Sequence, residues 1–358
     1  MIISYFLGNT IIDVPALNLI IYRMLLEIPK GKVTTYGAIA KALGDIIAAR
    51  AVAEVLSRNP LPEKIPCYKV IMSNGSIGGY TAPGGVKRKR ELLFEEGVIN
   101  DLNADKINLS EKFFSPKVEY HYLEGLKRIQ EYLRKNLKLK SFEKEPKVIV
   151  GIDLAYVSAK LFDFGIAVAV AYNTRSHDYI GASFSVTPVL FPYIPTYLAF
   201  RELPAALFAL YELEKYIPSL DVIIIDGQGI LHPRGLGIAS HLGIYINKPT
   251  IGVAKKLLSG KIGGEVLRIK KNKDLLKVYS VILDNELRGY LIEKTKRKKI
   301  IVSPGNLISV QDSLDLILKL PWTRGNTIDV VYLAHKLVSS FRDKIKNILT
   351  RIPNHFEH

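Results

Sequence analysis

The chain has 358 residues, with 50 Lys and Arg against 34 Asp and Glu, a formal net charge of +16 and a single cysteine. This length suits two domains, and a hydrophobic share of 48% with 23% charged residues excludes a wholly disordered chain. One cysteine excludes a disulfide scaffold and a cysteine-based zinc site, and no apolar run reaches the roughly 18 residues of a membrane span. The N-terminus shows neither a basic leader nor a cleavage site, so we expect a cytoplasmic protein with no membrane association.

The excess positive charge is concentrated in the later part of the chain. Residues 1–110 have a net charge of +3, whereas residues 111–358 have a net charge of +13. Basicity of this size attracts polyanions, and nucleic acid is the commonest polyanion inside a cell. A solvated lysine-rich face is the alternative interpretation, so charge alone leaves nucleic-acid binding open.

Two short helices are predicted near the N-terminus. An apolar-faced helix spans residues 17–26. A second helix over residues 36–43 has Thr34 or Thr35 as its capping residue and ends at Gly44.

A third helix, over residues 46–59, follows at once and is rich in alanine. Two helices joined by a tight, glycine-containing turn are typical of a helix-turn-helix, whose second helix would carry Arg50 and Arg58. Plain helix packing is the alternative, because alanine is simply the best helix former.

A polar stretch over residues 100–115 lacks apolar periodicity and is the best linker candidate. Beyond it, residues 119–140 predict an amphipathic helix. We therefore expect a domain boundary near residue 108, with domains over residues 1–108 and 109–358. The apolar stripe of the amphipathic helix consists of Leu123, Leu126, Ile129, Leu133 and Leu137.

The second domain begins with three apolar runs that predict consecutive antiparallel strands. Strands that first pair in a meander and then alternate with helices indicate a mixed α/β sheet. The three runs are residues 147–156, 164–172 and 179–186; a helix follows near 196–217, a strand over 221–226, further strands over 249–253, 275–283 and 287–293, and a terminal helix from about 327.

Cys67 lies in a setting that suits a reactive thiol. Pro66 fixes the backbone before it, and a glycine-rich loop over residues 78–85 lies downstream, where a flat ligand can approach the backbone closely. An inert buried cysteine is the alternative for any single cysteine in an intracellular protein.

The stretch from Ile28 to Gly97 resembles the DNA-binding and active-site domain of the O6-alkylguanine-DNA alkyltransferases. The matching segments are GKVTTYGAIA, ARAVAEVLSRNP, IPCYKVI, GGYTAPGG and LLFEEG, in the family's order and spacing. The resemblance implies that Cys67 takes an alkyl group from guanine O6, which needs a thiolate and a flipped base. It further implies DNA-contacting or positioning roles for Tyr36, Arg50, Asn59, Tyr80 and Thr81, and a proton relay anchored by Glu96.

One departure from that family follows the nucleophile. Tyr68 and Lys69 stand where the family has His and Arg. Tyrosine has an ordinary pKa near 10, so it is a poor base at neutral pH. Either Tyr68 relays a proton in a hydrogen-bonded chain with Glu96, or transfer is weak and the first domain is a non-enzymatic alkylguanine-binding module that recruits the second.

Three acidic residues in the second domain stand where metals bind. Asp153 and Asp226 each end an apolar run, and Glu202 opens or caps the intervening helix. Carboxylates on adjacent strands can share a hard cation, so this oxygen-only set favours Mg2+, with Mn2+ able to substitute. Ordinary turn residues are the alternative.

The segment DGQGILHPRG, residues 226–235, resembles the signature of endonuclease V, the deoxyinosine 3′ endonuclease. Further echoes are GIDLAY, PYIPTYLAFRELP, GLGIASHLG, PTIGVAKKLL and SPGNLISVQDSLDLI, so the similarity runs from about residue 119 to 345. It implies a ribonuclease-H-like fold and cleavage of the second phosphodiester bond 3′ of deoxyinosine. It also implies metal binding by Asp153, Glu202 and Asp226. Tyr193 would be a wedge between the DNA strands, and the backbone of 227–229 would recognise hypoxanthine. His232 and Lys255 would make phosphate or active-site contacts, and His335 would have a catalytic-site role.

These patterns predict a multidomain protein: a helical, winged helix-turn-helix-like alkyltransferase domain followed by an α/β, ribonuclease-H-like endonuclease V domain with a mixed sheet. The predicted function is bifunctional DNA repair, with damaged DNA as the partner and no obligate protein partner. A ribonuclease-H-like nuclease acting on RNA or branched DNA is the remaining alternative for the second domain.

Overall fold

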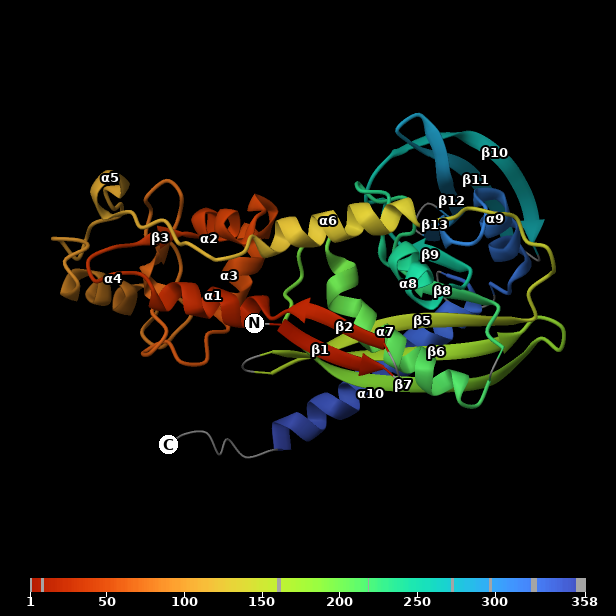
Figure 1. Ribbon diagram of the computed structural model, residues 1–358, viewed down its shortest axis with the longest axis horizontal. Helices are drawn as coiled ribbons and strands as arrows, with labels where there is room; N and C mark the ends of the chain where they lie inside the picture. Colours follow the sequence, from red (N-terminus) through yellow and green to blue (C-terminus); the bar gives the residue numbers. More distant parts are fainter. Residues whose placement is uncertain are drawn as a thin grey trace.

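The structure is a computed structural model that describes residues 2–7, 10–159, 162–217, 219–271, 274–295, 298–322 and 327–351. The molecule is elongated, with a mainly helical lobe at one end and a sheet-based lobe at the other (Figure 1). Helix α6 (Tyr122–Lys135) runs along the top of this view from the first lobe to the second. None of the described helices is long and apolar enough to cross a membrane.

The predicted second and third helices are present and are joined by a tight turn. Thr35 caps the second helix, because its Oγ1 accepts a hydrogen bond from the Ala38 amide at 3.1 Å, and Gly44 ends it with a φ of 102°. The third helix differs from the prediction, since Asp45 caps a short 3-10 turn, η1, before the regular helix begins. The elements are α1 (Leu17–Leu26), α2 (Tyr36–Leu43), η1 (Ile46–Ala48) and α3 (Ala49–Ser57).

The remaining elements of the helical lobe hold the cysteine. β3 and β4 pair in parallel and fix the η2 turn against the start of α2, and α4 packs behind η2. These elements are β3 (Thr34–Thr35), η2 (Cys67–Lys69), β4 (Val70–Ile71), α4 (Gly85–Glu95) and α5 (Leu109–Lys112).

We expect Thr35→Ala to lower the free energy of unfolding by about 1 kcal/mol, because the N-cap acceptor for the Ala38 amide is lost. Thermal unfolding should show a fall in Tm of a few degrees. Thr35→Ser keeps the hydroxyl oxygen and should restore most of the loss. An alanine variant as stable as the wild type would show that this cap contributes nothing.

Contacts of the first lobe continue past residue 108. Ile107 is buried in the cluster that holds Val33, and the Phe114 amide donates to the Val33 carbonyl at 2.7 Å. The helix expected over residues 119–140 is shorter, and its predicted stripe was partly wrong. Ile129 is exposed, whereas Gln130 is buried because it hydrogen-bonds to Thr196 and Arg234 of the second lobe.

The second lobe contains a mixed sheet in the order β10-β11-β12-β13-β9-β8-β5-β6-β7. The predicted antiparallel meander β5-β6-β7 is confirmed, and β8 and β9 then continue the sheet in parallel with β5. The strands are β5 (Val148–Ser158), β6 (Asp163–Asn173), β7 (Asp178–Val189), β8 (Val222–Asp226), β9 (Thr250–Ala254), β10 (Lys261–Lys271), β11 (Asp274–Leu283), β12 (Glu286–Thr295) and β13 (Lys298–Asn306).

Helices cover both faces of this sheet. α7 and α8 pack on one face, and α9 and α10 pack on the other. The β1–β2 hairpin lies beside α7 (Figure 1). Their bounds are β1 (Ile2–Leu7), β2 (Thr10–Pro15), α7 (Leu198–Glu214), α8 (Ile238–Ile246), α9 (Val310–Lys319) and α10 (Asp329–Arg351).

Several of these elements were not predicted. β10 is an edge strand whose residues are mostly exposed on both faces, so it carries no alternating apolar pattern. β13 contains Pro304 and Gly305, which are typical turn residues, yet it pairs with both β12 and β9.

The two lobes share buried side chains. One cluster includes Leu25, Val52 and Cys67 of the first lobe together with Leu203 and Ile223 of the second. The lobes are therefore packed against each other through an apolar interface.

Candidate active sites

Cys67 lies in the η2 turn and is 7% exposed. Asn59 donates from Nδ2 to the Ile65 carbonyl at 2.8 Å and to Cys67 Sγ at 3.1 Å, and Tyr80 hydrogen-bonds to the same thiol. Burial raises the pKa of the Cys67 thiol, while these hydrogen bonds oppose the rise. The site thus holds the thiol in place and offers donors that stabilise its thiolate form.

Tyr68 and Glu96 form a direct pair. The Tyr68 hydroxyl donates to Glu96 Oε1 at 2.6 Å, and Lys69 Nζ lies 3.0 Å from Glu96 Oε2. Burial, followed by the hydrogen bond and charge of Glu96, raises the pKa of Tyr68 well above its ordinary value. Tyr68 is therefore a neutral hydrogen-bond donor to Glu96 at neutral pH and is unsuited to act as a base.

The residues expected to contact DNA lie around α2 and α3. Tyr36 is half-buried and, with Ala49 and Ala53, lines an open groove of about 930 Å3, while Arg50 is exposed. Small side chains at these positions allow a nucleic-acid groove to approach the helix closely. Thr81 is exposed, but its hydroxyl donates to the Ser57 carbonyl at 3.0 Å, so it braces the loop against α3.

Lys89 is a residue near the thiol that the sequence analysis did not predict. It is 1% exposed and donates from Nζ to the carbonyls of Val70 at 2.7 Å and Gly79 at 3.2 Å. Burial lowers the pKa of Lys89 to about 8, and the nearby charge of Cys67 opposes that shift. Because Lys89 belongs to the basic run KRKR, it looks like a solvated helix residue in the sequence, and only packing separates it from its neighbours.

The three predicted carboxylates of the second lobe lie near one another on two adjacent strands and the neighbouring helix α7. Residues 152 and 225 are in register on β5 and β8, so Asp153 and Asp226, one position further on, lie on adjacent strands. Asp153 is in the middle of β5 rather than at its end, because β5 continues to Ser158. Glu202, in the second turn of α7, is buried and accepts a hydrogen bond from the Tyr156 hydroxyl at 3.1 Å.

The carboxylates act electrostatically on one another. Burial raises the pKa of Glu202 to about 8, and the charges of Asp226 and Asp153 add to that rise. Burial also raises the pKa of Asp153, again with a contribution from Asp226. Lys255 Nζ lies 2.8 Å from Asp226 Oδ2, and His335 Nδ1 lies 2.6 Å from Asp153 Oδ2. The carboxylates therefore disfavour one another's ionisation, and the Lys255 ammonium offsets part of their negative charge.

This donor set suits a hard divalent cation. Within the described part of the chain, no three His, Cys, Asp or Glu side chains are already arranged as a metal site. However, Asp153, Glu202 and Asp226 supply only oxygen atoms, and their mutual repulsion is what a bound cation relieves. A cavity of about 210 Å3 lies next to Asp226, Lys255 and His335. The residues present therefore fit a hard divalent cation.

The segment expected to be a wedge forms a tightly held loop over residues 192–196. Tyr193 is 54% exposed at its tip, whereas Ile194 is 1% exposed and anchors it. Thr196 has a φ of 69°, an uncommon conformation for a β-branched residue. The side chains that hydrogen-bond to Thr196 therefore determine the shape of this loop.

His232 lies beneath the loop. It is 3% exposed, its Nε2 lies 3.1 Å from the Thr196 carbonyl oxygen, and burial lowers its pKa to about 4. In this arrangement the neutral ring contacts the loop backbone. Arg234 and Gln130, which the sequence did not single out, also donate to the Thr196 carbonyl, at 2.6 and 3.2 Å.

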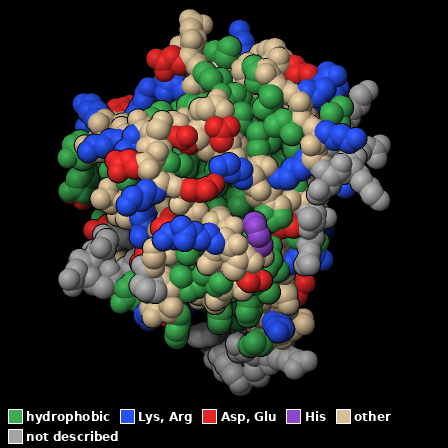
Figure 2. Space-filling model, turned by 90° about the vertical axis from the view of Figure 1, so that its right-hand side faces the viewer, with side chains coloured by type: hydrophobic (Ala, Val, Ile, Leu, Met, Phe, Trp, Pro, Cys, Tyr) green, Lys and Arg blue, Asp and Glu red, His purple; other side chains and the backbone are tan. Residues whose placement is uncertain are grey.

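The surface of the second lobe carries much of the positive charge. Figure 2 shows Lys and Arg side chains spread over the end of this lobe, with acidic side chains interspersed among them. This face agrees with the net charge of +13 over residues 111–358.

Comparison with known proteins finds relatives for both parts of the chain. The family model of endonuclease V matches residues 131–335, and that of the 6-O-methylguanine DNA methyltransferase DNA-binding domain matches residues 17–98. A bifunctional methyltransferase/endonuclease from Picrophilus torridus is 37% identical over 90% of this chain and 95% of its own length. Another from Thermoplasma volcanium is 35% identical over 83% and 82%. Endonuclease V from Bacillus subtilis, in its crystal structure, matches 64% of this chain and 94% of its own, with a TM-score of 0.56 and 26% identity.

The methyltransferase DNA-binding domain and the endonuclease V domain that these models match together define a two-domain enzyme that acts on DNA. The chain belongs to the bifunctional methyltransferase/endonuclease family, in which a methyltransferase DNA-binding domain precedes an endonuclease V domain. The predicted union of these two enzyme activities is confirmed. A first domain that only binds alkylguanine is not favoured.

Proposed function

We propose that Cys67 removes alkyl groups from O6-alkylguanine in DNA and that the second domain cleaves the second phosphodiester bond 3′ of deoxyinosine. The observation that carries this proposal is that one chain holds a buried thiol with hydrogen-bond donors around it and, separately, three neighbouring carboxylates on β5, β8 and α7, of which Asp153 and Glu202 are buried and Asp226 is half-buried. We assign the two activities to residues 1–108 and 109–358.

The first reaction consumes the protein. Cys67 Sγ, as a thiolate, forms a bond to the alkyl carbon while the bond from that carbon to O6 breaks and leaves its electron pair on guanine. Guanine then takes up one proton, which balances the proton lost by the thiol. Asn59 and Tyr80 support the thiolate by donating hydrogen bonds to it. We assign Tyr36 and Arg50 to the DNA backbone and the vacated stack, and Tyr80 and Thr81 to the flipped base.

The second reaction is hydrolysis. A water oxygen attacks phosphorus, the bond to the 3′ oxygen breaks, and 3′-hydroxyl and 5′-phosphate ends result. Asp153, Glu202 and Asp226 would hold a divalent ion, Mg2+ or Mn2+, which when bound activates water and stabilises the charge growing on phosphate. Lys255, with its ammonium beside Asp226, supports a negatively charged phosphate at this edge, and His335 holds Asp153 in place.

We also propose a ribonuclease-H-like class for the second domain and a winged helix-turn-helix class for the first. The support for the former is the order β7-β6-β5-β8-β9, an antiparallel meander extended by two parallel strands. Tyr193 is our candidate wedge residue, and the backbone of residues 227–229 our candidate for hypoxanthine recognition. The Gly229 and Gly252 backbones are packed too closely for side chains at these positions.

The direct test uses two DNA duplexes and the intact protein. After incubation with O6-methylguanine DNA, mass spectrometry should show a gain of one methyl group on the protein. A deoxyinosine duplex in Mg2+ should be nicked at a single position by the same preparation. Nicking without methylation would mean that the first domain only recognises the lesion, and methylation without nicking would contradict the nuclease assignment.

Tyr68→His is expected to speed alkyl transfer by at least about tenfold. An imidazole with an ordinary pKa near 6.5 can accept the thiol proton at neutral pH, whereas the Tyr68 hydroxyl cannot. Single-turnover transfer followed by intact mass measures the rate. Tyr68→Phe, which loses only the hydroxyl bonded to Glu96, should stay within about threefold of wild type. Complete loss in Tyr68→Phe would instead place the tyrosine in the relay.

A further inference from the structure

The interface between the lobes meets the wedge loop at both of its ends. At the upstream end, the Asn18 amide of α1 donates to the Leu190 carbonyl at 3.1 Å. Close by, Arg201 donates to the Phe191 carbonyl, one residue before the loop begins. The first and second lobes therefore share the backbone at which this loop leaves β7.

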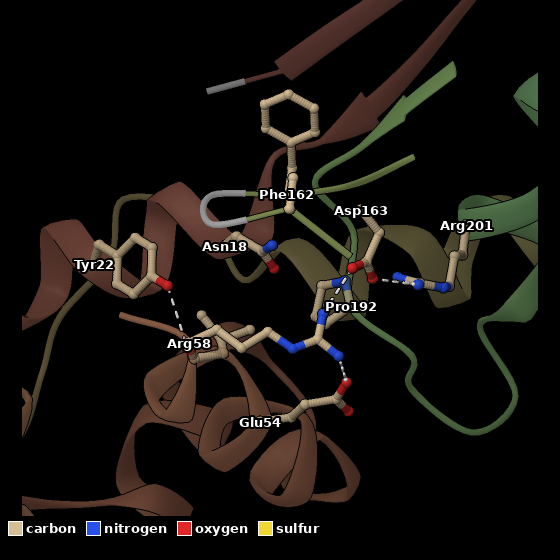
Figure 3. A pocket seen from close by; sticks show the side chains of 10 residues that line it. Asn18, Tyr22, Glu54, Arg58, Phe162, Asp163, Pro192 and Arg201 are labelled. Carbon is tan, nitrogen blue, oxygen red and sulfur yellow. Dashed lines mark hydrogen bonds and ion pairs between the residues drawn. The ribbon is translucent and has the colours of Figure 1, made fainter. Parts of the chain in front are cut away.

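Arg201 is itself connected to α3, the second helix of the predicted helix-turn-helix, which we call the recognition helix. Its Nη2 donates to Asp163 Oδ2 at 2.7 Å, and the other carboxylate oxygen of Asp163 accepts from Arg58 Nη1 of the first lobe at 2.7 Å. Arg58 also bonds to Glu54 of α3. Figure 3 shows these side chains pointing toward one another across the interface. Asp163 is 6% exposed and Arg201 is 8% exposed, so their ion pair is shielded from water, whereas the Arg58 side chain reaches it from the exposed rim of the interface.

The downstream end is tied to the turn of the helix-turn-helix. Tyr197, which follows the loop and is fully buried, donates its hydroxyl to Asp45 Oδ2 at 2.8 Å. Lys127 of α6 lies 2.9 Å from the same oxygen, while Oδ1 caps η1. The turn after α2 also packs closely against α6, since a Cβ at Gly44 would lie 2.9 Å from the Glu124 backbone nitrogen.

Asp45 precedes the recognition helix and Arg58 follows it, so the two ends of the loop are connected to the two ends of one helix. We propose that Asp45 and Arg58 are positioning residues for the endonuclease, through which the alkyltransferase helix-turn-helix holds the wedge loop ready to part the DNA strands. This inference rests on the proposed wedge role of Tyr193.

The physical reason is that an exposed aromatic side chain enters a base stack only if its backbone does not yield. Thr196 already holds a strained φ of 69°, so the loop keeps this shape through its surroundings. Without Arg58, Asp163 Oδ1 loses its partner. The carboxylate can then draw Arg201 toward itself and away from the Phe191 carbonyl. Without Asp45, Tyr197 loses its buried acceptor.

The test compares two substrates that differ only in whether the strands are already parted. One is a duplex with a single deoxyinosine, and the other has the same deoxyinosine inside a bubble of mismatched bases. We expect Asp45→Ala and Arg58→Ala each to lower kcat on the duplex about fivefold, with KM changed less than twofold. Activity on the bubble should remain within twofold of wild type.

Three further variants sharpen this test. Tyr197→Phe keeps the buried ring and removes only the hydroxyl, so it should reproduce the duplex-selective loss even if Asp45→Ala folds poorly. Arg58→Lys should recover part of the rate. Arg23→Ala is the matched control, because Arg23 is an exposed side chain of α1 that pairs with Glu27, the residue that caps the same helix, at 3.7 Å.

Unchanged duplex activity in all three substitutions at positions 45, 58 and 197 would overturn the proposal. So would an equal loss on the duplex and the bubble, because that pattern indicates general damage to the nuclease. If the wild-type protein cuts neither substrate, the proposed nuclease specificity is contradicted instead. The wild-type lanes of the same assay distinguish this outcome from the other two. Fluorescence of 2-aminopurine beside the deoxyinosine should rise less with the variants than with wild type.

Discussion

Asp226→Asn should reduce nicking of a deoxyinosine duplex by about a thousandfold or more and leave alkyl transfer unchanged. Asp226 and Asp153 each lie one position beyond the paired residues Ile225 and Ile152, and an amide in place of Asp226 removes one anionic donor from the proposed cation site. A cation contributes several kcal/mol to stabilising the transition state, and about 4 kcal/mol corresponds to three factors of ten.

The measurement is single-turnover nicking with Mg2+ in excess. Asp343→Asn serves as the control, because Asp343 is an exposed carboxylate on α10 that pairs with its neighbour Arg342. If Asp226→Asn retained more than a tenth of the wild-type rate, Asp226 would be excluded as an essential ligand. The alkyl-transfer assay on the same sample shows that the chain is folded.

Cys67→Ala should abolish methylation of the protein altogether while nicking continues at the wild-type rate. The thiol is the only sulfur nucleophile of its kind in the chain, since there is a single cysteine. The fold should survive, because Asn59 keeps its hydrogen bond to the Ile65 carbonyl when the sulfur is removed. Intact mass after incubation with O6-methylguanine DNA measures the result.

A methyl group acquired by Cys67→Ala would assign the transfer to another side chain and contradict the mechanism. Loss of nicking in the same variant would show that the thiol site supports the nuclease. The comparison is informative because the first activity ends after one event, whereas the second can turn over. Protein already methylated at Cys67 should therefore continue to cut deoxyinosine DNA.

The departure at Tyr68 changes the electrostatics of the first site. Glu96 accepts from the Tyr68 hydroxyl and also pairs with Lys69, so its negative charge is compensated by a neutral phenol and an ammonium. Buried Lys89 adds a second positive charge near the thiol. In this chain, support for the thiolate comes from fixed donors and nearby charge rather than from an imidazole base.

Much of the local structure could be predicted because its causes are local. Thr35 and Gly44 delimit α2 through a side-chain cap and a left-handed backbone, and both signals lie within a few residues of the helix. Alternating or continuous apolar runs likewise identified β5, β6, β7 and β8. Sequence motifs then pointed to Cys67 and to the three carboxylates.

Other features depend on contacts between distant parts of the chain. The register of β5 on β8 places Asp153 beside Asp226, and burial of Lys89 depends on how α4 packs against η2. Gln130 is buried in place of Ile129 because it reaches Thr196, 66 residues away. The periodicity of apolar residues in the sequence does not indicate which distant residues will be in contact.

The sequence by itself determined the two chemistries, the order of the domains and most helix and strand positions, since these depend on residue type and short-range spacing. Only the tertiary structure decided that Arg58 meets Asp163, 105 residues away, and that Asp45 meets Tyr197 across 152 residues. Such pairs form because apolar packing between the lobes brings the helix-turn-helix against the wedge loop. At Asp163 and Tyr197, which are buried, the carboxylate and the hydroxyl each take a hydrogen-bond partner from the other domain.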